Sequence, residues 1–144
     1  MDFPCVDDVD QQTTNCLVLK VMGGTYDPHQ ANIKALREKK DNVCDVDIRI
    51  TPEPHNIVDK NALLIEVLMN DNEWAPIGYI GVEHIKRVKA SIDKQEITSI
   101  RVKDIKRKFT PIVQTFVYTC YITIVKHGSW KPKDFKASYN SMSI

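Results

Sequence analysis

Hydrophobic and polar residues alternate along much of this chain with the two-residue period of a β-strand. The alternation is clearest from residue 43 to 50, where Cys44, Val46, Ile48 and Ile50 fall on one face. Successive side chains of a strand point to opposite faces, so this pattern predicts a strand with one buried face. Similar apolar or alternating runs predict five more strands, at 16–22, 63–69, 77–80, 97–105 and 115–125.

Two other stretches have features of a helix. Between 82 and 92, apolar residues recur on one face and cations lie toward the other, which predicts an amphipathic helix. Between 28 and 40 the apolar content is modest, although Asp27 can cap a helix that has Pro28 at its first position. A helix and an ordered loop both remain open there. The whole pattern predicts a mostly β protein: a small antiparallel barrel of five or six strands with one or two helices.

The length of 144 residues fits a single domain with a real core. Residues 1–14 are acidic and without periodicity, and we expect them to be disordered; residues 15–127 form the domain, and 128–144 a polar, flexible tail. No apolar run is long enough to span a membrane. The first residues also lack the charged and apolar regions of a secretory signal, so we expect an intracellular protein.

Charge is distributed unevenly along the chain. Residues 1–80 contain 7 Lys or Arg and 14 Asp or Glu, a balance of −7, whereas residues 81–144 contain 13 and 5, a balance of +8. A basic half suits a polyanionic partner such as nucleic acid. An equally good explanation is that the opposite charges of the two halves neutralise each other in the fold.

Nothing in the sequence has the spacing of a catalytic or metal-binding motif. The four histidines are scattered, and the cysteines at 5, 16, 44 and 120 are too far apart for a metal knuckle. We interpret Cys44 and Cys120 as reduced core residues. We therefore expect no enzyme activity, no cofactor and no metal.

The segment 54–62 (Pro-His-Asn-Ile-Val-Asp-Lys-Asn-Ala) is a loop by composition, because Asn and Asp side chains bond nearby backbone groups. Loops held on a rigid sheet often carry binding residues. A short strand, Ile77-Gly78-Tyr79-Ile80, follows farther on, with a glycine where the backbone bends or approaches a neighbour. Asp59 has two interpretations, a ligand contact and a local Asx-turn, and residue type alone favours the turn.

The order and spacing of these residues resemble the HIRAN family, small domains at the front of some SNF2-type helicases and in other DNA-processing or mobile-element proteins. The resemblance covers residues 43–95 and is carried by Glu53, Pro54, Asn56, Asp59, Asn61, Ala62 and Ile77 to Ile80. It implies an OB-like β-barrel, a fold that commonly binds single-stranded nucleic acid along one face. It also implies a nuclear, helicase-associated protein of DNA repair.

The resemblance also implies a site. Asp59 would accept a hydrogen bond from the 3′-hydroxyl of single-stranded DNA, and Asn56 would lie near the DNA. A carboxylate repels phosphate, so it would select a strand end that offers a hydroxyl. The remaining expected DNA contacts are Val58, Lys60, Tyr79, Tyr26, Lys86 and Phe109. Phe109 follows three cations, as at a strand-binding surface, although a core phenylalanine beside a solvated basic turn fits equally well.

Val58 departs from the family pattern. Helicase-type members have a tyrosine immediately before the aspartate, and its ring stacks on the terminal base; valine has no ring. Two functions remain. The first is a non-catalytic module that binds single-stranded DNA, and its 3′-hydroxyl end, and targets a larger DNA-processing protein. The alternative is a protein-interaction or structural module on the same barrel with the DNA site lost. The oligomeric state is open, and a monomer is assumed.

Overall fold

The computed structural model of the chain describes residues 15–39, 42–70 and 72–130. Its elements are β1 (Cys16–Lys20), α1 (His29–Lys39), the 3-10 turn η1 (Val43–Asp45), β2 (Ile48–Pro52), β3 (Leu63–Asn70), β4 (Glu73–Tyr79), α2 (Val82–Asp93), β5 (Ile97–Thr110) and β6 (Thr115–Lys126). The segment 1–14 and all but the first residues of the predicted tail lie outside the described residues, and the predicted division of the chain stays a prediction.

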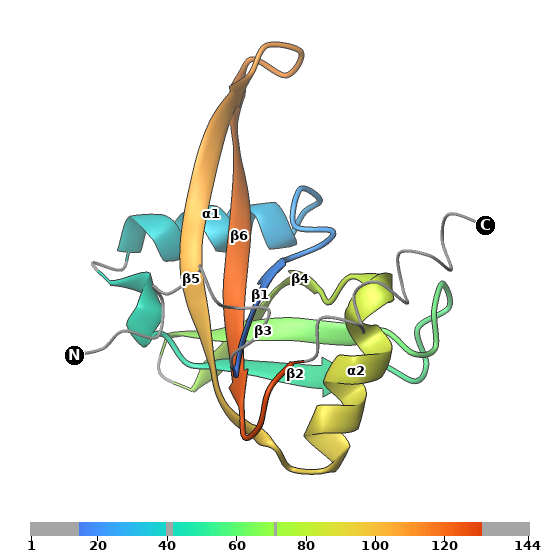
Figure 1. Ribbon diagram of the computed structural model, residues 1–144. Helices are drawn as coiled ribbons and strands as arrows, with labels where there is room; N and C mark the ends of the chain where they lie inside the picture. The colour runs from blue at the N-terminus through green and yellow to red at the C-terminus, as the bar shows by residue number, and fades with distance from the viewer. Residues whose placement is uncertain (1–14, 40–41, 71, 131–144) are drawn as a thin grey trace.

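The strands form two antiparallel sheets of three strands each, ordered β1-β6-β5 and β2-β3-β4 (Figure 1). One isolated backbone bridge, between Met22 and Tyr79, connects them. At the opposite seam β2 and β5 are not hydrogen-bonded, and isoleucines 48, 50, 92, 97 and 100 line a hollow of about 420 Å³ there. A mostly β fold with two helices is therefore confirmed for the described residues, whereas the predicted barrel is not closed.

One apolar core fills the space between the sheets and the helices. Its fully buried members include Ile65 and Val67 of β3 and Ile122 and Ile124 of β6, each 0% exposed. The stretch 28–40, which the sequence left open, contains the helix α1, whose Ile33 and Leu36 reach this core. The helix begins at His29, one residue after the predicted Pro28, and the carboxylate of Asp27 accepts a hydrogen bond from the backbone N of Ala31 in its first turn at 3.2 Å.

The prediction of a strand over residues 43–50 is wrong in its first half. Asn42 caps the turn η1 by accepting a hydrogen bond from the backbone N of Cys44 at 3.1 Å, and β2 begins only at Ile48. A polar side chain that bonds its own backbone competes with strand pairing, and here it wins. Cys44 is half-buried and disulfide-bonded rather than a free core thiol.

The strands β5 and β6 are longer than their neighbours and form a ribbon that extends away from both sheets, past α1 (Figure 1). The basic segment 106–108, predicted to follow the strand, is part of β5. The bulge that the sequence indicated within 97–105 is present as register shifts between Ile97 and Ser99 and between Val102 and Asp104. We call residues 106–118 the β5–β6 arm.

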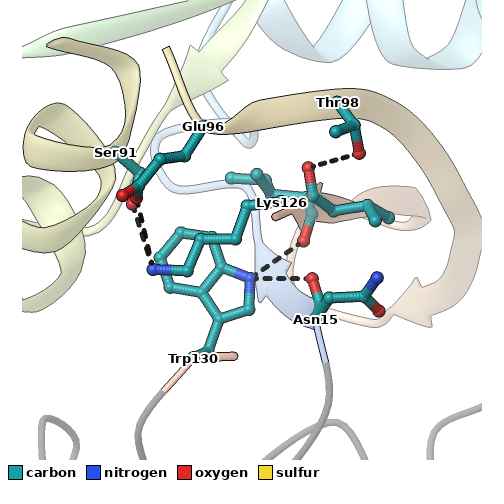
Figure 2. A network of polar contacts seen from close by, with 8 residues as sticks. Asn15, Ser91, Glu96, Thr98, Lys126 and Trp130 are labelled. Atoms are coloured by element: carbon teal, nitrogen blue, oxygen red, sulfur yellow. Dashed lines mark hydrogen bonds and ion pairs between the residues drawn. The ribbon is translucent and has the colours of Figure 1, made fainter. Parts of the chain in front are cut away.

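Trp130 extends the core into the segment that we predicted as a polar tail. Its side chain is 1% exposed, and its indole N–H donates to the carbonyl oxygens of Asn15 at 3.0 Å and Ile124 at 3.3 Å. The ammonium group of Lys126 lies 4.2 Å from the ring centroid and bonds Ser91, as Figure 2 shows. The tryptophan thus joins the start of β1 to the end of β6.

Candidate nucleic-acid interface

Asn56 organises the loop between β2 and β3. Its side-chain oxygen accepts hydrogen bonds from the backbone N of Val58 at 2.9 Å and of Asp59 at 3.0 Å. Its amide nitrogen donates to a carboxylate oxygen of Glu53 at 3.0 Å. Because both ends of the amide are used within the loop, Asn56 sets the backbone shape that presents the neighbouring side chains.

Asp59 acts as an Asx-turn residue, because its Oδ1 accepts a hydrogen bond from the backbone N of Asn61 at 2.8 Å. Within the described part of the chain, no protein group donates to its second oxygen, Oδ2. The side chain is half-buried. The two interpretations of Asp59 are therefore compatible, since one oxygen stabilises the loop and the other can accept a hydrogen bond from a ligand.

Tyr79 of β4 stabilises the loop through its hydroxyl group. Its hydroxyl donates to Glu53 at 2.8 Å, and its ring meets the ring of His29 edge-on, with centroids 5.8 Å apart. Burial, followed by the hydrogen bond to Glu53 and the charge of that carboxylate, raises the pKa of Tyr79. The hydroxyl therefore stays a donor at neutral pH. Contact between Tyr79 and a nucleotide stays a prediction.

A groove of about 510 Å³ lies between this loop and α2. Asp59 lines it from the loop, and Lys86, Lys89 and Asp93 line it from the helix, where Lys86 and Lys89 stand one turn apart. The ammonium group of Lys89 lies 3.6 Å from a carboxylate oxygen of Asp93. The structure thus brings together Asp59 and Lys86, two residues predicted from the sequence. Sequence reasoning missed Lys89, although its three-residue spacing from Lys86 on a predicted helix is the signal that places both on one face.

The tip of the loop carries two apolar side chains in full contact with solvent. Ile57 is 99% exposed and Val58 is 91% exposed. Val58 was a predicted site residue, and Ile57 was not. An exposed apolar pair beside a charged groove is typical of a contact surface. The periodicity of the sequence does not show whether such a pair is exposed or buried.

The other predicted residues lie outside the groove. Lys60 is exposed on the loop, and Tyr26 is 73% exposed on the segment that leads into α1. Phe109 lies on the β5–β6 arm, where its ring meets that of Phe116 edge-on at 5.7 Å. Phe109 is 51% exposed, so it is not a core residue. The structure therefore divides the predicted contacts between two surfaces.

Among the described residues, no group of three or more His, Cys, Asp or Glu is placed to hold a metal ion, and neither helix is long and apolar enough to cross a membrane. Burial, with a smaller effect of Asp104, raises the pKa of Cys120 to about 12. That thiol is therefore not a nucleophile at neutral pH.

No protein-family profile and no curated protein sequence matches this chain. Among solved structures, the chain is similar to the crystal structure of the HIRAN domain of human HLTF, with a TM-score of 0.42 and 16% sequence identity. The alignment covers 90% of this chain and 87% of that chain. A likeness this distant carries no argument about function, which depends on the site itself. HIRAN is also the family that the residues around Asp59 resemble in sequence.

Proposed function

We propose that this chain is a non-catalytic DNA-binding module that holds the 3′-hydroxyl end of single-stranded DNA in the groove between the β2–β3 loop and α2. The observation that carries the proposal is the presence of Asp59 in one groove with Lys86 and Lys89. Lys86 can hold a phosphate, and Lys89 can do so by exchanging its exposed ion pair with Asp93 for a phosphate. The open oxygen of the Asp59 carboxylate can accept a hydrogen bond from a terminal hydroxyl.

The carboxylate supplies selectivity in this arrangement. A phosphate in contact with Asp59 would place two negative charges together, whereas a hydroxyl would donate a charge-assisted hydrogen bond, which contributes about 1.5–3 kcal/mol. The groove would therefore distinguish a free 3′ end from a phosphorylated end or from the interior of a strand. We further propose that the module works in the nucleus, within a larger protein of DNA repair that it directs to such ends.

A second candidate function is a protein-interaction module. Ile57 and Val58 favour it, because two adjacent and almost fully exposed apolar side chains at a loop tip suit a protein pocket. Valine also lacks the ring that would stack on a terminal base. The charged groove beside this tip favours DNA as the first choice.

Fluorescence anisotropy tests the proposal with two single-stranded oligonucleotides of the same sequence, one with a free 3′-hydroxyl and one with a 3′-phosphate. We expect tighter binding of the free end at every salt concentration. Equal affinities would refute selection of the end, and absence of binding to both would leave the protein-interaction module as the better explanation.

A further inference from the structure

The β5–β6 arm is a second basic surface, separate from the groove. Lys106, Arg107 and Lys108 are consecutive on β5, and all three are exposed. The sequence from Ile105 to Trp130 contains no Asp or Glu to balance them. Figure 1 shows the arm projecting away from the sheets, on a different side of the molecule from the β2–β3 loop and α2. The arm is therefore a cationic projection that is separate from the groove in its position and in its residues.

The cations of the arm lie on both faces of the ribbon, because side chains alternate along a strand. Arg107 is paired with Tyr118 and Phe109 with Phe116, which puts these four residues on one face. Lys106 and Lys108 lie on the opposite face, across from Thr119 and Val117. A ribbon that lies between the two phosphate backbones of a DNA groove needs positive charge on both of its faces, and the arm meets this condition.

The tip of the arm is apolar but narrow. Ile112 is 92% exposed and Val113 is 57% exposed in the turn between the strands. Pro111 directly precedes the pair, and the polar residues Thr110, Gln114 and Thr115 separate it from Phe109 and Phe116, which are 51% and 42% exposed. Insertion into lipid requires a broad apolar face, whereas two branched side chains within a polar turn make a small wedge that can contact bases.

The two phenylalanine rings of the arm contact each other and the guanidinium group of Arg107. The guanidinium group of Arg107 lies 4.5 Å from the centroid of the Phe116 ring, and the Phe109 ring packs edge-on against the same ring. These contacts stiffen the ribbon near its tip. Arg107 also occupies one face of the Phe116 ring, which leaves less of that ring for the stacking of an unpaired base and favours a duplex as the partner.

We propose that the β5–β6 arm enters the major groove of duplex DNA, with Lys106, Arg107 and Lys108 on the phosphates and Ile112 and Val113 against the bases. The major groove of B-DNA is about 12 Å wide and admits a two-stranded β-ribbon, whose strands lie about 4.8 Å apart. Apolar side chains can contact the thymine methyl groups there. This surface is additional to the single-strand groove and does not depend on it.

The test uses the full chain and a covalently closed DNA dumbbell, which has a duplex stem but no 3′ end for the groove to hold. The arm variant replaces all three cations (Lys106→Gln, Arg107→Gln and Lys108→Gln), and the tip variant carries Ile112→Ser and Val113→Ser. The matched control, Lys34→Gln with Lys94→Gln, removes two exposed cations that belong neither to the arm nor to the groove lining. Circular dichroism confirms that each variant is folded.

We expect the arm variant to bind the dumbbell much more weakly, with a log–log salt slope smaller by up to about 2.7, at about 0.9 per lost phosphate contact. The tip variant should lose affinity severalfold, and the control should bind as the parent does. The arm variant should still bind a single strand with a free 3′ end, so the two sites can fail independently.

Three results would overturn the proposal. The first is equal binding of the dumbbell by the parent protein and the arm variant. The second is equal binding of an RNA dumbbell, because the A-form major groove is too narrow and deep for side chains to read. The third is absence of dumbbell binding together with arm-dependent binding to anionic phospholipid vesicles, which would identify the arm as a membrane contact.

Discussion

Met22 and Tyr79 exchange two backbone hydrogen bonds, from Met22 N to Tyr79 O at 2.9 Å and from Tyr79 N to Met22 O at 2.8 Å. The bridge extends β1 onto the end of β4 and so joins the two sheets. Through the hydroxyl of Tyr79 it also supports Glu53 and the loop that carries Asp59. The position of the candidate site thus depends on the seam between the sheets.

Gly78 makes this seam possible, and we predict that Gly78→Ala destabilises the protein by about 2–5 kcal/mol. Its φ is +145°, and an added Cβ would meet the Val21 side chain and the Met22 carbonyl. Gly128→Ala is the control, because Gly128 also has a positive φ, +83°, but has nothing within 4 Å of an added Cβ. It should cost only the backbone strain, about 1–2 kcal/mol. Chemical denaturation measures the free energy of unfolding of both variants. Equal losses of stability would show that the close contact of Gly78 with Val21 and Met22 does not matter.

Asp59→Asn tests the carboxylate while keeping an acceptor for the Asn61 backbone. We predict that it weakens binding of a free 3′-hydroxyl end by about 1–2 kcal/mol, since a neutral amide is a poorer acceptor, and leaves a 3′-phosphate end unchanged or bound more tightly. Asp47→Asn, exposed just before β2 and not part of the groove lining, should not alter the discrimination. Anisotropy gives both affinities. A parallel loss for the two ends would assign Asp59 to the loop alone.

Val58→Tyr should tighten binding to single-stranded DNA by up to about 1–3 kcal/mol, because a terminal base gains a stacking partner. The side chain is 91% exposed, so the fold should tolerate the ring. Ile57→Tyr is the matched control at the neighbouring position, which is 99% exposed. If both variants gained equally, the ring would be a non-specific contact rather than a cap on the strand end.

The salt dependence of single-strand binding should report the groove cations. We expect Lys86→Gln with Lys89→Gln to reduce the log–log slope by about 1.4, at about 0.7 per phosphate contact. Lys34→Gln, exposed on α1 away from the groove, should leave the slope unchanged. Anisotropy titrations over a range of salt concentrations measure the slope. An unchanged slope in the double variant would remove these lysines from the DNA contact.

Glu66 predicts a pH dependence of stability. The Nε of Arg49 donates to it at 2.8 Å and the hydroxyl of Thr51 at 2.9 Å, and the bond to Arg49 is the main reason that the pKa of Glu66 is lowered from its usual 4.5. Because the pKa of Glu66 is lower in the folded state than in the unfolded state, ionised Glu66 stabilises the protein at any pH above its unfolded-state pKa. This contribution is lost as the pH falls through the folded-state pKa.

We therefore expect Glu66→Gln to be less stable than the parent near neutral pH and to lose less stability than the parent on acidification below about pH 4.5. Denaturant titrations at neutral and acidic pH give the free energies of unfolding. Glu38→Gln, exposed on α1, should follow the parent profile. The same acid loss in the Glu66 variant and the parent would show that other carboxylates dominate.

Local pattern was enough to find most elements of this protein. The apolar run of β3 and the one-sided pattern of α2 specify their own conformation, because burial of one face is already implied by the spacing of residues. The loop around Asp59 was recognisable for the same reason, since Asn and Asp side chains shape the backbone beside them. The turn at 43–45 was missed because alternation alone does not reveal that Asn42 caps it.

Other features depend on contacts between segments distant in the sequence. The sheets are joined at the Met22–Tyr79 seam and open at the β2–β5 seam, and strand periodicity contains no information about which strands pair. Trp130 packs into the core, and its indole N–H can be buried because Asn15 and Ile124 accept its hydrogen bonds. Lys106–Lys108 and Phe109 are a projecting arm rather than a turn because β6 pairs with β5 along its full length. Amino-acid sequence by itself determined the elements and the loop chemistry; tertiary structure decided which charges share a groove, because only packing brings α2 to Asp59.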